Sequence, residues 1–238
     1  MSSPRSISVT PITTESSVRQ GFDITVRCFC HQTYDGVFVA MNPGWDTLEG
    51  HEAGAQRFVD RWRSTRSKGN NTVFLQGTLP VNGEEKVVGF AIWQQLSMIT
   101  GSGDEPSDVD AAAIYPDNEA EQKYVLSLDR SLHKRRRGMV EEKAKPPASP
   151  PAVFVLDLCV VHPEYQRRGV ANALVQWGLD EAKRRGGLEC VTEASAMGRH
   201  VYEKLGFHQE GGEVEYDVAE EFKSRLLPSN IFMRTGGG

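Results

Sequence analysis

Hydrophobic and polar residues alternate along this chain with two different periods, and each period predicts its own kind of element. Residues 13–32 carry apolar side chains at three- and four-residue steps, which is typical of an amphipathic helix. Residues 152–161 (AVFVLDLCVV) form the most apolar run in the chain, as expected for a strand buried on both faces. The stretch 33–49, with Pro43-Gly44 inside it, predicts irregular structure.

The same patterns divide the rest of the chain. The predicted strands are residues 5–12, 71–79, 86–96, 152–161, 188–195, a strand beginning at Phe207, and 229–234. The predicted helices are residues 13–32, 51–66, 118–144, 170–185 and 198–206. Asn82-Gly83 predicts the turn of a β-hairpin. Strands and helices alternate in the second half, which favours an α/β sheet with parallel pairing there.

Length and composition narrow the class of protein. The chain has 238 residues, more than the roughly 150 of an average domain, so it is expected to be one large domain or one domain with an addition. The extra residues fall in the segment 97–151, which begins rich in Gly, Ser, Asp and Pro and ends in PPASPP. This segment is too polar to form a core of its own and indicates an insertion.

Charge and cysteine content exclude several partners. A net charge of −5 argues against a protein that binds nucleic acid mainly through its phosphates. No apolar run reaches the roughly 18 residues of a membrane span, and the N-terminus lacks the apolar segment of a signal peptide. The four cysteines have no metal-ligand spacing, so no metal is expected. These features favour a reduced, cytoplasmic protein. The basic run Lys134–Arg137 leaves a nuclear location open, although a solvated helix face is favoured.

The segment that carries candidate chemistry follows the strand 152–161. The loop residues Gln166-Arg167-Arg168-Gly169-Val170-Ala171 lead into the predicted helix 170–185. Unpaired N–H groups at a helix start attract an anion such as a pyrophosphate, and small residues let the backbone approach it. The spacing alone fits a polar loop that happens to contain glycine equally well. No Walker lysine follows, which disfavours a nucleotide hydrolase of the P-loop class.

Two motifs together resemble those of one enzyme family. The loop 166–171 is similar to the Q/R-x-x-G-x-G/A loop of the GNAT acetyltransferases, and residues 198–207 (GRHVYEKLGF) resemble that family's second signature, Y-x-x-x-G-F. The resemblance implies one GNAT domain over residues 1–238. Its α/β fold would have a mixed, mostly antiparallel sheet, a splayed parallel strand pair and helices on both faces. The insertion at 97–151 makes the chain look like a fungal branch of the family.

The resemblance also implies acetyl-CoA as co-substrate and assigns residues to it. In this family the backbone of the strand before the loop holds the pantetheine arm, as an added strand would be held. The residues implied for that contact are Cys159, Val160 and Val161. The residues implied for the pyrophosphate are Arg167, Arg168, Gly169, Val170, Ala171 and Asn172. A family asparagine that contacts the cofactor is replaced by Ser195, which keeps one hydroxyl donor but puts that contact in doubt.

Three side chains are candidates for catalysis. Tyr202 matches the family tyrosine that protonates the departing CoA thiolate; the alternative is a core aromatic residue. An amine with a pKa of about 10.4 is mostly charged at neutral pH and must lose a proton before it attacks. Asp157 and Glu193 are the candidates for a general base, directly or through water. A structural hydrogen-bonding role fits each of them equally well.

The sequence therefore predicts an acetyl-CoA-dependent N-acetyltransferase in which a primary amine attacks the thioester directly. A small-molecule amine is favoured, because the insertion is expected to lie over the acceptor side and narrow it. Two alternatives remain open: an acetyltransferase for protein lysines or N-termini, and an acyl-CoA-binding module without activity. The sequence leaves a homodimer open.

Overall fold

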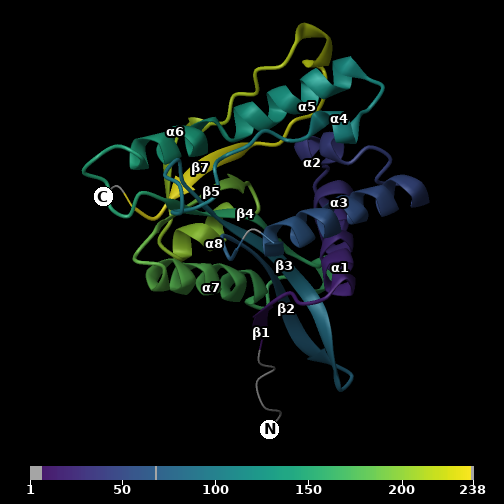
Figure 1. Cartoon of the computed structure of the whole chain (residues 1–238). Coiled ribbons are helices and arrows are strands. Elements are labelled where there is room, and N and C mark those ends of the chain that lie inside the picture. Colours follow the sequence, from purple (N-terminus) through teal and green to yellow (C-terminus); the bar gives the residue numbers. More distant parts are fainter. Residues whose placement is uncertain (1–6, 68, 237–238) are drawn as a thin grey trace.

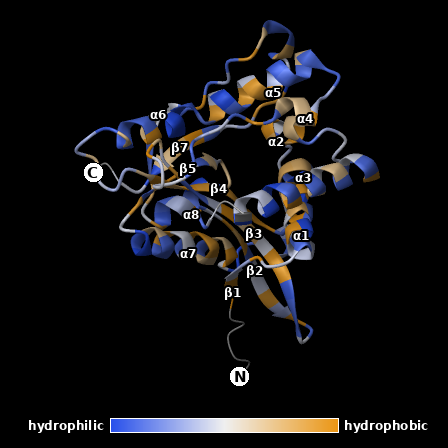
Figure 2. Ribbon diagram, viewed as in Figure 1, coloured by the Kyte–Doolittle hydropathy of each residue, from blue (hydrophilic) through white to orange (hydrophobic). Residues whose placement is uncertain are grey.

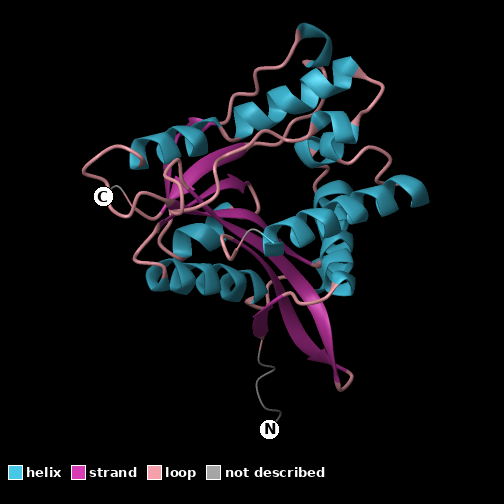
Figure 3. Ribbon diagram, in the orientation of Figure 1, coloured by secondary structure: helices cyan, strands magenta, loops and turns pink. Residues whose placement is uncertain are grey.

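The centre of the molecule is a twisted sheet whose strands run in the order β1-β2-β3-β4-β5-β7-β6 (Figures 1 and 3). The structure is a computed structural model that describes residues 7–67 and 69–236. Its strands are β1 (Ser8–Pro11), β2 (Thr72–Val81), β3 (Glu84–Leu96), β4 (Val153–Val161), β5 (Glu189–Ser195), β6 (His208–Glu213) and β7 (Asn230–Arg234). Neighbouring strands pair antiparallel except β4 and β5, which are parallel. The predicted fold class is confirmed.

The parallel pair separates soon after it forms. β4 and β5 pair only where Val153–Val155 faces Glu189–Val191, and both strands continue beyond that point. The Thr192 hydroxyl donates to the Leu156 carbonyl at 2.9 Å, across the start of the opening. Beyond it, the carboxyl ends of β4 and β5 splay apart, as predicted. The open backbone edge is therefore on β4 and β5, at the end of the sheet where ligands of α/β folds bind.

Helices cover both faces of the sheet. The helices are α1 (Glu15–Val26), α2 (Gly36–Met41), α3 (Leu48–Ser67), α4 (Ala111–Ile114), α5 (Glu119–Leu132), α6 (Lys134–Lys143), α7 (Val170–Arg184) and α8 (Arg199–Lys204). One core cluster lies between the sheet and α7 with α8; it includes Trp93, Phe154 and Leu174. On the other face, α1 and α3 cover β2–β4, and α6 covers β4, β5 and β7. Figure 2 shows hydrophobic residues along the strands and hydrophilic residues on the outer turns of α5 and α6.

A separate small core joins the segment 97–151 to two distant parts of the chain. Tyr124, Val125 and Leu128 of α5 pack against Val37 of α2 and Phe222 near the C-terminus. Figure 1 shows α4, α5 and α2 together at the top of the molecule, with the C-terminal chain passing over α5. The segment 97–151 thus buries its apolar residues against other elements.

Three predicted boundaries change in the structure. The irregular stretch 33–49 contains α2, because the Asp35 carboxylate caps that helix by accepting from the N–H groups of Val37 and Phe38. The single helix predicted over 118–144 is two helices with a break at His133, because α5 and α6 bury their apolar faces against different cores. The helix predicted over 13–32 ends in a π-helical turn, η1 (Arg27–Gln32).

The hairpin prediction is confirmed, with Asn82-Gly83 at its turn. Of the first predicted strand, residues 5 and 6 lie outside the described residues, and β1 accounts for most of the remainder. In the described part of the chain, no helix combines the length and the apolar character needed to cross a bilayer.

Candidate active site

A cavity of about 690 Å³ opens where β4 and β5 separate. Ten residues that the sequence singled out line it: Cys159, Val160, Val161, Arg167, Gly169, Val170, Ala171, Asn172, Ser195 and Tyr202. They come from β4, the loop before α7, the first turn of α7, the end of β5 and α8. The splay of the sheet thus brings together residues that lie up to 43 positions apart, from 159 to 202. Three predicted site residues, Asp157, Arg168 and Glu193, do not line it.

The wall formed by β4 offers free backbone groups. The His162 N–H donates to the Val88 carbonyl on β3, so the alternation of the antiparallel ladder turns the amides of Val161 and Cys159 toward the opening. The Cys28 thiol and the Gln166 side chain both donate to the Val161 carbonyl. The Cys159 amide group remains for an extended ligand with amide groups, which would bind as an added strand.

The loop before α7 curls its backbone into an anion-binding shape. Arg167 and Gly169 both have left-handed backbones, with φ of 60° and 87°, and α7 starts at Val170. Successive N–H groups in such a turn point into one concavity, and the helix start adds partial positive charge. A pair of mutual hydrogen bonds between the Gln32 and Gln166 side chains joins this loop to η1.

Arg168 faces away from this concavity. Its guanidinium lies 5.0 Å from the Tyr165 ring centroid and donates to the Glu164 carbonyl at 3.0 Å. The sequence analysis placed Arg168 with Arg167 on the phosphates, but only Arg167 lines the cavity. The left-handed backbone at Arg167 turns the two neighbouring side chains in different directions.

Tyr202 reaches the cavity from α8 and is 7% exposed. Its hydroxyl has no hydrogen-bond partner among the described residues. Burial, with a smaller contribution from nearby Cys159, raises the pKa of Tyr202 well above its ordinary value, so the hydroxyl keeps its proton at neutral pH. Gly198 lies beneath the ring: a Cβ atom there would stand 2.6 Å from Tyr202 Cε2.

The two thiols in the cavity wall are poor nucleophiles. Burial raises the pKa of Cys159 to about 12 and that of Cys28 to about 11. Thiolate, not thiol, is the reactive form. Both cysteines are therefore protonated at neutral pH.

The two predicted base candidates meet under α6, on the face of the sheet that α1, α3 and α6 cover. The β4–β3 register skips Asp157, and this bulge lets the side chain point toward α3 and α6. Arg136 of α6 donates to Asp157 Oδ1 at 2.7 Å and to both oxygens of Glu193. Arg61 of α3 donates to Asp157 Oδ2, also at 2.7 Å. Both carboxylates are thus held by arginines.

Burial alone would raise the pKa of Asp157, but the attraction of Arg61 and Arg136 outweighs it and holds that pKa well below its usual range. A carboxylate that resists protonation so strongly is a weak base. Groups of His, Cys, Asp and Glu able to hold a metal ion are absent from the described residues.

The geometry can be compared with known proteins. A model of the Acetyltransferase (GNAT) family matches residues 39–207. The chain belongs to this family. The match covers the hairpin, β4, the loop before α7, β5 and α8 up to Phe207. The cavity residues of β4, of that loop and of α8 lie within it, whereas those of residues 28–35 and 226–229 lie outside it. A search of curated proteins finds no match to the chain.

Solved structures described as acetyltransferases share the fold. A structure described as histone acetyltransferase HPA2 and related acetyltransferase, from Corynebacterium glutamicum, superimposes with a TM-score of 0.58 at 16% identity, covering 98% of this chain and 97% of the other. Mosquito arylalkylamine N-acetyltransferase like 5b superimposes with a TM-score of 0.57 at 14% identity, covering 96% of this chain and 99% of the other. The yncA protein of Salmonella typhimurium, solved with its cofactor acetyl-CoA, superimposes with a TM-score of 0.52 at 12% identity. The match covers 98% of this chain and 96% of the other.

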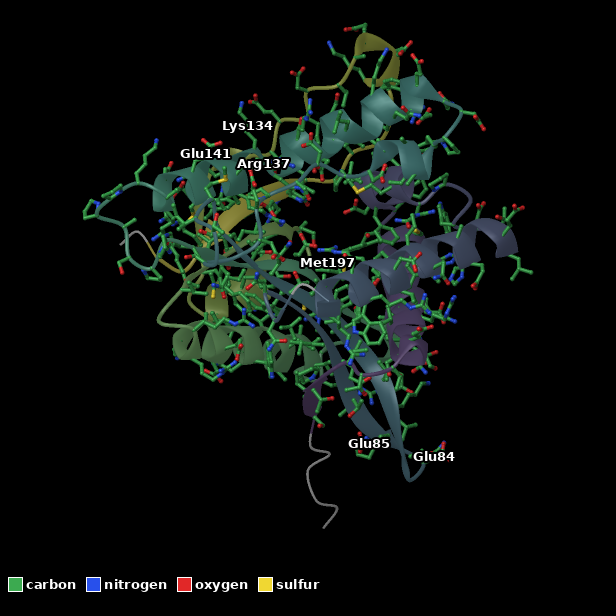
Figure 4. The ribbon with its side chains drawn as sticks, in the orientation of Figure 1. Glu84, Glu85, Lys134, Arg137, Glu141 and Met197 are labelled. Atoms are coloured by element: carbon green, nitrogen blue, oxygen red, sulfur yellow. The ribbon has the colours of Figure 1, made fainter. Side chains whose placement is uncertain are left out.

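Arg136 is the residue of this GNAT site that sequence reasoning missed. The run Lys134–Arg137 was expected to be a solvated helix face, but Arg136 is buried, with its side chain 6% exposed. Lys134 and Glu141 do point away from the sheet (Figure 4). A signal existed: Met139 and Val140 follow Arg136 at three and four positions, which places all three on one helix face.

Several residues that do line the cavity were also missed, because they lie far from the two motifs. They come from η1 and the turn after it, and from the chain before β7: Cys28, Phe29, Gln32, Thr33, Asp35, Leu226, Leu227, Pro228 and Ser229. Tyr34 of the same turn is a plausible pocket aromatic from the sequence, and it does line the cavity. No residue of the segment 97–151 lines the cavity; α5 packs behind α2 instead. Only the folded chain brings these segments to the end of β4.

Proposed function

We propose that the protein is an acetyl-CoA-dependent N-acetyltransferase acting on a primary amine. The observation that carries this proposal is a single cavity that combines the open edge of β4, the anion-binding loop before α7 and the Tyr202 hydroxyl. An amide-rich arm, a pyrophosphate and a leaving thiolate need these three features. The residues present fit acetyl-CoA, with Cys159–Val161 along the arm and with Arg167, Gly169, Val170, Ala171 and Asn172 at the pyrophosphate. Ser195 lines the cavity at the end of β5 and has a free hydroxyl to offer.

Acetyl-CoA supplies the acetyl group as a thioester. A C–N bond forms to the acceptor nitrogen as the C–S bond breaks. The protonated amine loses one proton before the attack and a second one after it, and the sulfur gains one. Tyr202 donates the proton to sulfur and recovers one from solvent. The raised pKa keeps Tyr202 protonated until charge develops beside it. The protonated state of Cys28 and Cys159 favours direct attack over an acyl-enzyme intermediate.

We assign a structural role, and not the role of general base, to Asp157 and Glu193. Their ion pairs with Arg136 tie α6 to the two strands that splay, and neither carboxylate lines the cavity. The amine proton then leaves through water in the cavity, and the two carboxylates hold β4 and β5 in place.

A small-molecule amine is the favoured acceptor. The cavity of about 690 Å³ has to hold the acetyl-CoA arm as well as the acceptor, which leaves room for a small acceptor. The structural neighbours point both ways, since one is described as a histone acetyltransferase and another as an arylalkylamine N-acetyltransferase. A fungal origin, a cytoplasmic location, a homodimer and a single domain with an insertion at 97–151 remain predictions.

The test is acetyl-CoA turnover over a panel of primary amines and a lysine-containing peptide, followed as free thiol released. We expect wild-type turnover with amines. Tyr202→Phe should lower kcat by about 10²–10⁴-fold while leaving the KM for acetyl-CoA nearly unchanged, because it removes the acid and not the binding groups. The matched control is Tyr165→Phe, which removes an exposed hydroxyl outside the cavity.

Three outcomes would count against the proposal. An unchanged kcat in Tyr202→Phe at every pH would remove Tyr202 as the acid. Tight acetyl-CoA binding without turnover on any acceptor would indicate a binding module. A strong preference for the peptide would indicate a protein acetyltransferase.

A further inference from the structure

The part of the cavity beyond Tyr202 is enclosed by two segments that are distant in sequence. One is the turn Thr33–Asp35 before α2, and the other is Leu226–Ser229 before β7. The two touch closely: a Cβ atom on Gly36 would lie 1.8 Å from the Leu226 carbonyl oxygen. Since neither segment belongs to the loop before α7, this end of the cavity is left for the acceptor.

Asp35 is the only carboxylate among the described residues that line the cavity. Its Oδ1 accepts from the N–H groups of Val37 and Phe38, both at 3.0 Å, and thereby caps α2. Its Oδ2 has no hydrogen-bond or ion-pair partner among the described residues. Asp157 and Glu193 differ on this point, since arginines hold both. The cavity thus contains one acidic oxygen free to receive a cation.

The surroundings of Asp35 are apolar and partly open. Six large hydrophobic side chains are exposed in the described part of the chain, and three of them line this cavity: Tyr34 at 49%, Met197 at 53% and Leu226 at 65%. Figure 4 labels Met197 near the centre of the view, in the loop between β5 and α8. Exposed apolar side chains that gather at one cavity are typical of a ligand site.

Tyr34 also has a costly backbone. Its φ of 49° is left-handed, a conformation that an aromatic residue rarely adopts. Strain of this kind is found preferentially at ligand sites, where the surrounding structure holds it. The strained residue places a ring at the cavity directly before the free carboxylate.

We propose that Asp35 binds the acceptor amine as a cation, and that Tyr34, Met197 and Leu226 hold an apolar group attached to it. The inference rests on the proposed acetyltransferase function and names its substrate class: a primary amine with an apolar group a short distance from the nitrogen. Asp35 is then a specificity-determining residue. Burial raises the pKa of Asp35, and its effect is larger than that of the two backbone hydrogen bonds, which lower the pKa. A cation that approaches Asp35 therefore stabilises its charged form.

The test compares three small probes. 2-Phenylethylamine is cationic and apolar, ethanolamine is cationic and polar, and 2-phenylethanol is the neutral analogue of the first, used as a competitive inhibitor. Wild-type kcat/KM should be about 10-fold or more higher for 2-phenylethylamine than for ethanolamine, given the free energy of burying a phenyl group. 2-Phenylethanol should inhibit competitively against 2-phenylethylamine.

The first variant is Asp35→Asn, which keeps a capping oxygen for α2 but removes the charge. We expect kcat/KM for 2-phenylethylamine to fall about 10–100-fold, mainly through KM, as for a lost charge-assisted hydrogen bond. The KM for acetyl-CoA and the inhibition constant of 2-phenylethanol should stay within about twofold, because a neutral probe does not use the charge. Asp110→Asn, which changes the cap of α4 outside the cavity, is the matched control.

The second variant is Leu226→Ser, with Leu48→Ser as its control at an exposed position outside the cavity. Leu226→Ser should weaken the binding of 2-phenylethylamine and 2-phenylethanol but not that of ethanolamine, since only the first two carry the phenyl group.

Each result decides between the two proposals. A wild-type protein that acetylates no amine overturns the proposed function and this inference with it. Wild-type turnover with an Asp35→Asn variant that behaves like wild type overturns the inference alone. If Asp35→Asn weakened the binding of 2-phenylethanol as much as that of 2-phenylethylamine, Asp35 would only support the fold. A preference for ethanolamine would overturn the apolar part.

Discussion

At the scale of single residues, the cavity depends on a few positions where the geometry requires glycine. Gly169 allows the left-handed backbone that starts α7, and Gly198 leaves room for the Tyr202 ring. Both lie inside the two motifs that the sequence showed. Local motifs report such positions well because the constraint is set by the immediate neighbours in the chain.

Gly198→Ala tests the placement of Tyr202. The backbone of Gly198 has φ −82°, which alanine adopts freely, so the whole effect comes from the added Cβ, 2.6 Å from the ring. We expect the ring to shift and kcat to fall by about tenfold or more, since catalysis is sensitive to misplacement of about 1 Å. The measurement is kcat with acetyl-CoA and the best amine acceptor. A kcat equal to wild type would mean that the position of the ring is not critical.

The sequence did not predict the direction in which some side chains point. Arg167 and Arg168 are chemically equivalent in the sequence, yet only the first faces the cavity. The sequence did not single out Asp35, because its importance comes from the segments that surround it in space. Side-chain direction in an irregular loop follows from backbone angles that a sequence pattern does not specify.

At the scale of elements, α6 acts as a clamp on the two strands that separate. Its Arg136 binds Asp157 on β4 and Glu193 on β5 from a buried position. Because β4 and β5 share few backbone hydrogen bonds, this three-residue network supplies a connection that the sheet itself lacks. The segment 97–151 therefore contributes to the site without lining the cavity.

Arg136→Met measures that connection. The substitution leaves two buried carboxylates, of which Glu193 loses its ion-pair partner, and breaking a buried ion pair costs about 3–5 kcal/mol. We expect a loss of that size in the free energy of unfolding by chemical denaturation, together with a weaker affinity for CoA. Lys134→Met on the exposed side of the same helix should change the free energy by less than about 0.5 kcal/mol. A loss below about 1 kcal/mol in Arg136→Met would contradict the clamp.

At the scale of the whole molecule, the stability should depend on acid in a way that Asp157 helps to set. Its folded pKa lies well below the unfolded value of about 3.9, so the unfolded chain binds more protons between those two values. The stabilisation is therefore complete above about pH 5 and is lost as the pH falls through the folded pKa.

Unfolding free energies measured from pH 6 to pH 2 should show this loss below about pH 4 in the wild type. Asp157→Asn cannot release or take up that proton, so its curve should be lower at pH 6 and flatter below pH 4. Parallel curves for the two proteins would show that Asp157 contributes nothing to the acid sensitivity.

The sequence by itself determined the α/β class and the loop before α7, and its resemblance to the GNAT acetyltransferases implied the splayed strand pair and singled out Tyr202. The motifs that carry this resemblance are contiguous residues with a strong local pattern. Tertiary structure alone decided how the segment 97–151 is used and what lies at the far end of the cavity. Arg136 reaches Asp157 across 21 positions, and Gly36 meets the Leu226 carbonyl across 190. Such contacts depend on how elements pack, and no spacing within one segment carries that information.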